Sequence, residues 1–257
     1  GGTVEMTVMN ASLLAGVAKE MAIFDFPFLF NNTKEADAVS DGPVGQKLLD
    51  KLQDKGLVGL AYWENGFRNL TNSKRPVTKL EDLNDVKLRV MQNNVYLDSF
   101  KLLGANAVPM PFSELFSALE TKTVDGQENP LFLFNLLKMH TVGQKYITTW
   151  GYMADPLVFV VNKEIWNSWT PADQAIVRQA ALDAGQQEIA IARKGLIEAD
   201  KPVIKGIEAL GVTVTQLTPA QRDEFVKATR PVYNKWKATI GTDLVNTAEA
   251  AIAARKK

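Results

Sequence analysis

The segment from Lys87 to Pro130 constrains the fold of this chain most, because strand-like and helix-like patterns alternate in it without long connections. Apolar alternation predicts the strands, and apolar residues at helical spacing predict the helices. The predicted elements are the strands Lys87–Met91, Ala107–Met110 and Thr123–Gln127, a helix that ends at Gly104, and a helix that Ser113 caps and that runs to about Glu120. Strands that alternate with helices form a parallel sheet, so we expect an α/β fold.

Polar side chains follow the predicted strands at the point where ligands bind in such sheets, the crevice beyond the carboxyl ends of the strands. These residues are Arg89, Gln92, Asn93, Phe112, Glu128 and Asn129. The planar fork of an arginine matches both oxygens of a carboxylate, so the group predicts a site for a small carboxylate held by Arg89. A second interpretation stays open, in which Arg89 is an ordinary strand arginine paired with Asp125 or Glu128.

Residues outside this segment leave similar alternatives. Asn10 follows the first predicted strand, and it is either a ligand contact from another part of the fold or a helix cap. Trp150 and Tyr152 lie either at the rim of the site or in the core. The aromatic run Phe24–Phe30 is expected to be buried.

The composition excludes several functional classes. Lysine plus arginine equals aspartate plus glutamate at 29 each, so no global field attracts nucleic acid or an anionic membrane. The absence of cysteine excludes disulfides, thiolate nucleophiles and zinc–cysteine sites. No apolar run approaches the roughly 20 residues that a membrane-spanning helix needs. No cofactor is expected.

Catalytic motifs are also absent from the sequence. It contains no dinucleotide or phosphate-binding glycine loop, no Gly-x-Ser-x-Gly and no His-Glu-x-x-His. The single histidine, His140, lies in a helical stretch and not at the end of a strand. An enzyme is therefore disfavoured, although carboxylate pairs still allow acid–base chemistry.

Three short sequences carry a resemblance to a known family: LRVMQN at 88–93, GANAVPMPFSELFSALET at 104–121, and VDGQENP at 124–130. They closely resemble the solute-binding proteins of tripartite ATP-independent periplasmic (TRAP) transporters, in the DctP (C4-dicarboxylate-binding) branch, and the likeness extends over the whole chain. The resemblance implies a two-lobed, periplasmic-binding-protein-like α/β fold with a long kinked helix spanning both lobes.

The resemblance also implies particular ligand contacts. Arg89 is expected to hold the ligand carboxylate, Arg68 of the Gly-Phe-Arg segment to add a second charge at the mouth of the cleft, and Phe112 to pack against the ligand. For Arg68, a solvated loop arginine remains the alternative. Together with the residues at strand ends, the expected ligand-binding residues are Arg89, Arg68, Asn129, Phe112, Gln92 and Asn10.

The predicted lobes divide the chain into four stretches. Residues 1–66 and 155–194 form lobe I, and residues 67–154 with 195–257 form lobe II. The crossing is expected at a turn formed by Trp63–Gly66. Thr170 and Pro171 start a helical run to about Leu210, which Pro202 should kink. Leu131–Tyr146 is predicted to be helical and Leu157–Val161 to be a strand.

These features predict a monomeric periplasmic receptor that captures a small organic acid and delivers it to the membrane permease subunits of a TRAP transporter. Two other classes stay open: a lyase-like enzyme on the same two-lobed scaffold, and a ligand-sensing module for a signalling partner. The chain enters a strand within its first residues, Gly1–Val8. Members of the family carry a strand, a helix and another strand before this point, so an N-terminal segment is expected to be missing.

Overall fold

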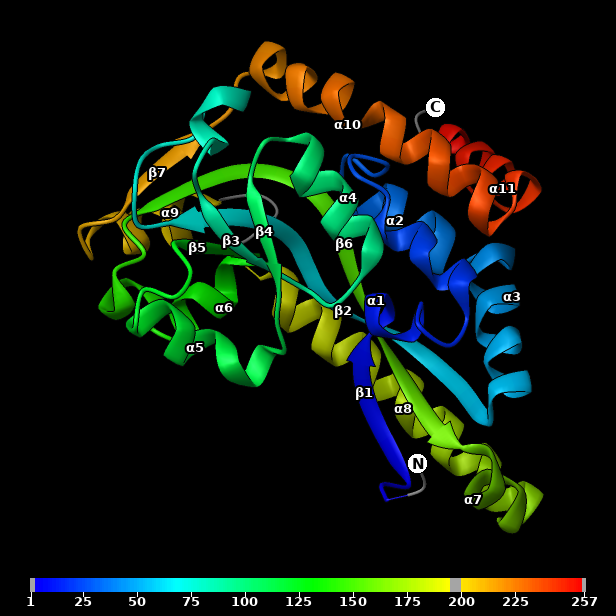
Figure 1. Cartoon of the computed structure of the whole chain (residues 1–257). Coiled ribbons are helices and arrows are strands. Elements are labelled where there is room, and N and C mark those ends of the chain that lie inside the picture. The colour runs from blue at the N-terminus through cyan, green and yellow to red at the C-terminus, as the bar shows by residue number, and fades with distance from the viewer. Residues whose placement is uncertain (1–2, 195–199, 256–257) are drawn as a thin grey trace.

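A computed structural model describes residues 3–194 and 200–255 of the chain (Figure 1). Its strands form one sheet in the order β1-β6-β2-β5-β3-β4, with β7 also paired to β6. The strands are β1 (Met6–Asn10), β2 (Leu57–Asn72), β3 (Lys87–Val90), β4 (Asn106–Pro109), β5 (Gly126–Asn129), β6 (Tyr146–Asn162) and β7 (Thr213–Gln216). The predicted α/β fold is confirmed.

Helices surround this sheet. The α-helices are α1 (Ala11–Leu14), α2 (Thr33–Ser40), α3 (Pro43–Lys51), α4 (Asn94–Leu102), α5 (Phe112–Glu120), α6 (Leu131–Leu136), α7 (Lys163–Ser168), α8 (Pro171–Arg193), α9 (Asp200–Glu208), α10 (Pro219–Ile240) and α11 (Thr242–Ala254). Short 3-10 turns are η1 (Lys19–Asp25), η2 (Leu52–Lys55), η3 (Leu80–Leu83) and η4 (Met139–Val142).

Two long antiparallel strands, β2 and β6, run through the middle of the molecule and connect its two sides (Figure 1). β1 pairs with the last residues of β6, whereas β5 and β7 pair at the other end of the two strands. The predicted turn at Trp63–Gly66 is wrong, because β2 continues through it. A register shift between Glu64 and Gly66 bends the strand there, and Gly66 has a positive φ of 106°.

The predicted β-α-β-α-β unit is present. β3 pairs in parallel with both β4 and β5, as expected for strands joined through helices. The third strand lies later than predicted, at Gly126–Asn129, because Lys122 adopts a left-handed conformation and the preceding residues form a turn. β5 pairs antiparallel with β2, so the whole sheet is mixed.

Several helix starts follow the sequence signals. The side chains of Asn32, Thr170 and Thr218 accept hydrogen bonds from backbone N–H groups in the first turns of α2, α8 and α10. The predicted cap at Ser113 is wrong: α5 begins at Phe112, and Pro111 occupies the cap position without a side-chain bond.

Two long runs that were predicted to be helical are interrupted in the structure. In Leu131–Tyr146, α6 ends at Leu136, and the left-handed Lys138 separates it from η4. The run after Thr170 divides into α8 and α9, since Lys194 is extended and ends α8. Pro202 lies in the first turn of α9. The connection at 195–199, and with it any bend there, lies outside the described residues, as do Gly1 and Gly2.

The main core lies between the sheet and the helices α2, α3, α4, α10 and α11. The aromatic side chains of Phe24–Phe30 are buried in it, as predicted. Trp150 and Tyr152 are also fully packed there, so the core interpretation of these two residues holds. α8 packs on β2, where Gly185 lies against the Trp63 ring and the Trp63 indole donates to the Ala181 carbonyl oxygen at 3.0 Å.

A candidate carboxylate-binding cavity

A cavity of about 340 Å³ lies beside the stretch where the paired strands β2 and β6 pass from one side of the molecule to the other, which we call the β2–β6 crossing. Its walls come from the end of β1 with α1, from β2, from the ends of β3, β4 and β5, and from β6, so they include elements on both sides of the crossing in Figure 1. The residues expected to bind ligand all line it; these are Arg89, Arg68, Asn129, Phe112, Gln92 and Asn10. Their roles as ligand contacts stay a prediction.

Arg89 is a buried arginine without a carboxylate partner among the described residues. Its side chain is 3% exposed, and its Nε donates to the Met110 carbonyl oxygen at 2.9 Å. The interpretation that Arg89 pairs with Asp125 or Glu128 is wrong. Asp125 lies 2.9 Å from Lys74 Nζ, and Glu128 pairs with a different arginine. Burial lowers the pKa of Arg89 to about 10, so the guanidinium stays protonated at neutral pH.

Arg68 is even more buried, at 1% exposed, and two carboxylates surround it. Its Nη2 donates to Glu128 Oε1 at 2.8 Å and to the Glu128 carbonyl oxygen at 2.6 Å, while Nε and Nη1 contact Glu128 Oε2 and Asp155 Oδ2. Burial alone would lower the pKa of Arg68, but Glu128 and Asp155 raise it well above its usual value. The expected position at the cleft mouth, and the alternative of a solvated loop arginine, are both wrong.

Amide side chains form the polar wall of the cavity. Asn10 and Asn65 each donate an Nδ2 hydrogen to Asp155, at 2.8 Å and 2.7 Å. Asn10 occupies the position before α1, but its side chain makes no capping bond. Gln92 is exposed at the rim. Asn93, which the sequence placed beside it, turns away from the cavity and donates to Ser12 and Asp25.

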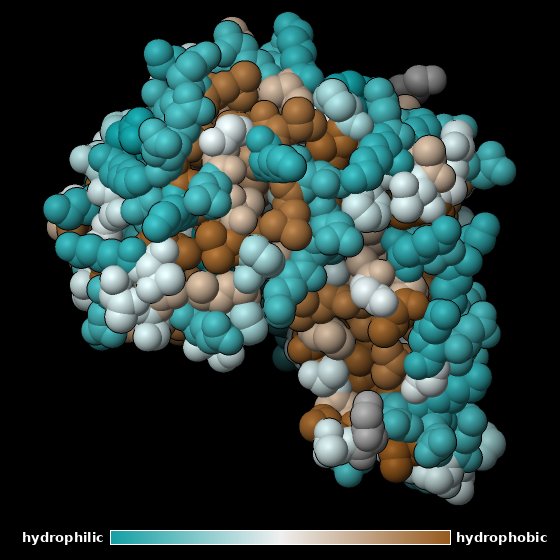
Figure 2. Space-filling view, in the orientation of Figure 1, coloured by the Kyte–Doolittle hydropathy of each residue, from teal (hydrophilic) through white to brown (hydrophobic). Residues whose placement is uncertain are grey.

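Apart from the two arginines and the amides, the lining residues are apolar. Phe112, the first residue of α5, is 48% exposed, and Leu13 of α1 is 42% exposed. Figure 2 shows hydrophobic residues on this face of the molecule over β1 and α1. The remaining apolar lining residues are Met91, Met110, Pro111, Leu133 and Leu157. The cavity therefore combines apolar residues with amides and with one cation, Arg89, that has no salt bridge among the described residues.

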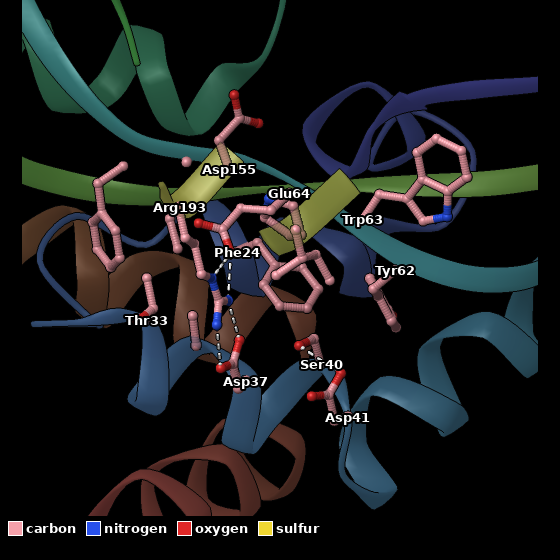
Figure 3. Close-up of a pocket in the computed structure, with 16 residues that line it drawn as sticks. Phe24, Thr33, Asp37, Ser40, Asp41, Tyr62, Trp63, Glu64, Asp155 and Arg193 are labelled. Carbon is pink, nitrogen blue, oxygen red and sulfur yellow. Dashed lines mark hydrogen bonds and ion pairs between the residues drawn. The ribbon is translucent and has the colours of Figure 1, made fainter. Parts of the chain in front are cut away.

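A second, much smaller cavity of about 40 Å³ surrounds the end of α8 (Figure 3). There the Arg193 guanidinium forms a two-pronged pair with Asp37, at 2.6 Å and 2.9 Å, and also contacts Glu64. Glu64 and Gly66 line this cavity, whereas Asn65 between them lines the larger one, as expected for neighbours on a strand. We interpret the small cavity as a packing feature around an ion pair that joins α8, α2 and β2.

Sequence reasoning missed two residues that shape the larger cavity: Asn65, which lines it, and Asp155, which lines the small cavity but contacts polar side chains of the larger one. Asn65 was placed in a turn, and Asp155 was not singled out, although it accepts bonds from Asn10, Asn65 and Arg68. A polar residue inside an otherwise apolar strand was the available signal for Asp155. Within the described residues there is no cluster of potential metal ligands and no helix long and apolar enough to cross a membrane.

Comparison with known proteins identifies relatives over most of the chain. The sequence model of the bacterial extracellular solute-binding proteins, family 7 (DctP), matches residues 1–239. A protein of Haemophilus influenzae is 39% identical over 84% of this chain and 64% of its own length. The 2,3-diketo-L-gulonate-binding periplasmic protein YiaO of Escherichia coli is 37% identical over 89% of this chain and 67% of its own length.

Solved structures agree in fold. A TRAP periplasmic solute-binding protein from Ralstonia eutropha H16, with bound (S)-2-acetolactate, is 52% identical and has a TM-score of 0.96 over 98% of this chain and 81% of that one. The sugar acid binding protein DctPAm from Advenella mimigardefordensis, in complex with galactonate, is 43% identical, with a TM-score of 0.92 over 98% and 80%.

The fold, in which two long paired strands connect the two sides of the molecule, is thus that of the TRAP periplasmic solute-binding proteins. The chain belongs to family 7 of the bacterial extracellular solute-binding proteins, the DctP family. It spans about two thirds of the length of the curated relatives named above.

Proposed function

We propose that this protein is a solute receptor that captures a small organic acid in the cavity beside the β2–β6 crossing. The observation that carries the proposal is the buried Arg89 guanidinium, which lines the cavity and has no carboxylate partner among the described residues. Burying a cation without a partner costs desolvation free energy, and a ligand carboxylate bound by the planar arginine fork offsets that cost. Relatives with bound acetolactate, galactonate and succinate support the same ligand class.

Capture in this proposal involves closure of the two predicted lobes, residues 1–66 with 155–194 and residues 67–154 with 195–257. Asn10 contributes from lobe I, and Arg89, Asn129 and Phe112 contribute from lobe II. A ligand that contacts both walls only in the closed form shifts the equilibrium towards that form. Exclusion of water on closure strengthens the pairing between Arg89 and the carboxylate.

The remaining parts of the proposal follow from family membership. The protein acts in the periplasm, binds as a monomer, delivers its ligand to the membrane permease subunits of a TRAP transporter, and does not change the ligand chemically. Relatives named as periplasmic binding proteins support the location and the role. Recovery of unchanged acid after prolonged incubation with the protein tests the absence of catalysis, and product formation would contradict it.

Calorimetric titration with small carboxylic acids and their amides tests the central step. We expect an acid to bind and its amide to bind at least about tenfold more weakly, because the amide lacks the charge that pairs with the fork. Arg89→Lys should weaken acid binding by about ten- to a hundredfold, since the charge stays and the fork is lost.

The matched control is Arg75→Lys, a conservative change at an arginine that does not line the cavity. It should bind like the unmodified protein. If Arg89→Lys binds every acid as well as Arg75→Lys does, Arg89 is not the carboxylate-binding residue.

A further inference from the structure

The charges of Arg68, Arg89, Glu128 and Asp155 sum to zero, but among the described residues they leave the Arg89 guanidinium without a salt bridge. The charged residues that line the cavity are Arg68 and Arg89. Glu128 and Asp155 both pair with Arg68, and within the described part of the chain neither forms a salt bridge with Arg89. A first ligand carboxylate therefore meets an unpaired guanidinium. A second carboxylate on the same ligand would meet no unpaired cation among the lining residues.

Two of the amide groups that line the cavity, those of Asn10 and Asn65, are held in one orientation. A carboxylate accepts hydrogen bonds and does not donate them, so Asp155 holds the Nδ2 groups of Asn10 and Asn65 towards itself. The Oδ1 atoms of these two amides make no hydrogen bond among the described residues. They are also not among the buried side-chain atoms that lack a partner, so they remain accessible.

Asn129 is oriented by a longer chain of hydrogen bonds that begins at a backbone carbonyl. The Asp125 carbonyl oxygen accepts from Gln144 Nε2 at 3.2 Å, so Gln144 Oε1 accepts from the Thr71 hydroxyl at 2.7 Å. The Thr71 oxygen then accepts from Gln127 Nε2 at 3.0 Å, and Gln127 Oε1 accepts from Asn129 Nδ2. Each step fixes the direction of the next.

The result of this chain is that one amide hydrogen of Asn129 is donated to Gln127, and the Asn129 Oδ1 is left without a partner among the described residues. With Asn10 and Asn65, the residues that line the cavity thus include three amides whose oxygens can accept hydrogen bonds, and one cation, Arg89, without a salt bridge among the described residues. Acceptor oxygens bind hydroxyl groups well and repel carboxylate oxygens, which have no hydrogen to share.

We propose that the ligand is a monocarboxylic acid with at least one hydroxyl group, and that dicarboxylic acids are excluded. This inference rests on the proposed function and adds the ligand class. The carboxylate pairs with Arg89, hydroxyl groups donate to the amide oxygens of Asn10, Asn65 and Asn129, and the carbon skeleton packs against the apolar wall at Phe112.

The test is a calorimetric comparison of four-carbon acids that differ in hydroxyl groups and in carboxylates. Butanoate, 2-hydroxybutanoate and erythronate are monocarboxylates; succinate, malate and tartrate are dicarboxylates. We expect the affinity of the tighter-binding hydroxylated monocarboxylate to be about tenfold higher than that of butanoate, which is the effect of one or two hydrogen bonds. Each dicarboxylate should bind at least about tenfold more weakly than the matched monocarboxylate, because its second charge is unpaired.

A variant tests the acceptor role separately. Asn129→Ala should weaken binding of the hydroxylated monocarboxylate about tenfold more than it weakens binding of butanoate. The matched control is Asn167→Ala, which removes an exposed amide on α7. A general structural defect in Asn129→Ala would weaken both acids alike, and the comparison on the unmodified protein does not depend on this variant.

The outcomes separate the two proposals. Suppose that an acid binds and that Arg89→Lys weakens its binding. If a dicarboxylate then binds as tightly as its matched monocarboxylate, or if hydroxyl groups do not increase the affinity, the ligand class is wrong and the receptor function stands. If no acid binds, or if Arg89→Lys changes nothing, the receptor function falls and the ligand class falls with it.

Discussion

Two buried arginines on neighbouring parts of the sheet have different surroundings. Arg68 is enclosed by Glu128 and Asp155, and the Tyr96 ring lies 5.6 Å from its guanidinium carbon. Arg89 has only the Met110 carbonyl oxygen as a hydrogen-bond partner among the described residues. Because two carboxylates already contact Arg68, the proposed function assigns the ligand carboxylate to Arg89.

Removal of one carboxylate from the Arg68 cluster should destabilise the fold. In Glu128→Gln, Arg68 keeps Asp155 but loses the charge of the carboxylate that accepts two of its hydrogen bonds, and we expect the free energy of unfolding to fall by about 3 kcal/mol. Denaturant unfolding measures this, with the exposed Glu114→Gln on α5 as the control. Equal stability of the two variants would mean that the buried pair contributes little.

Asp25 gives the stability a dependence on pH. Burial raises its pKa to about 7, although Ser12 and Asn93 donate hydrogen bonds to it and oppose the rise. Between its unfolded pKa of 3.8 and the folded value, unfolding releases a proton. Stability contributed by this proton is therefore lost as the pH rises from about 4 to about 7, and it does not change above that range.

Asp25→Asn should remove this dependence. The amide can accept from Asn93 and donate to Ser12, whose hydroxyl can then donate to the Tyr96 oxygen 3.4 Å away. Relative to the variant, we expect the unmodified protein to lose about 1.4 kcal/mol per pH unit between pH 4 and 7. Denaturant unfolding across this range measures it, with the exposed Asp54→Asn as control. Parallel curves for Asp25→Asn and the unmodified protein would refute the assignment.

Among the strands and helices, the sequence predicts features that depend on nearby residues better than features that depend on distant pairing. The helix start at Thr170 depends on residues within a few positions, and the sequence predicts it correctly. The passage of β2 through Trp63–Gly66 depends on pairing with β6, far along the chain, so Gly66 was interpreted as part of a turn.

The same limit applies to the candidate site. Strand ends and the family resemblance bring Arg89, Phe112 and Asn129 together in the prediction, and the structure places them at one cavity. The sequence does not reveal that Asp155 turns the amides of Asn10 and Asn65, because those residues come from three different strands.

Gly66 should tolerate a side chain poorly. Its φ of 106° is strained for other residues, and an added Cβ would lie 3.4 Å from the Pro130 Cβ. Gly66→Ala is expected to lower the free energy of unfolding by about 1–3 kcal/mol. The matched control is Gly206→Ala within α9, where no atom lies within 4 Å of the added Cβ, and which should stabilise the protein by about 0.5–1 kcal/mol. Equal effects of both changes on unfolding would contradict a special role for Gly66.

In the whole molecule, β2 and β6 each contribute residues to both the cavity and the small ion-pair site around Arg193, so a bend in these strands would move the walls of both. The Arg193 pairs with Asp37 and Glu64 join α8 to α2 and β2, all in predicted lobe I. The cavity instead takes residues from both predicted lobes. Ligand binding is therefore expected to change the distance between the lobes more than the structure within lobe I.

Small-angle X-ray scattering tests this expectation. A compact chain of this length has a radius of gyration of roughly 18 Å, and saturation with the tightest-binding acid of the four-carbon panel should lower the measured value as the lobes close. At the same acid concentration, the radius of gyration of Arg89→Lys should stay at its ligand-free value, because this variant binds little ligand. It should fall only when the acid concentration is raised in proportion to the weaker affinity. Scattering curves that superimpose with and without saturating acid would show that binding occurs without closure. The cavity would then have to hold the acid by the fixed contacts of Arg89 and the oriented amides alone.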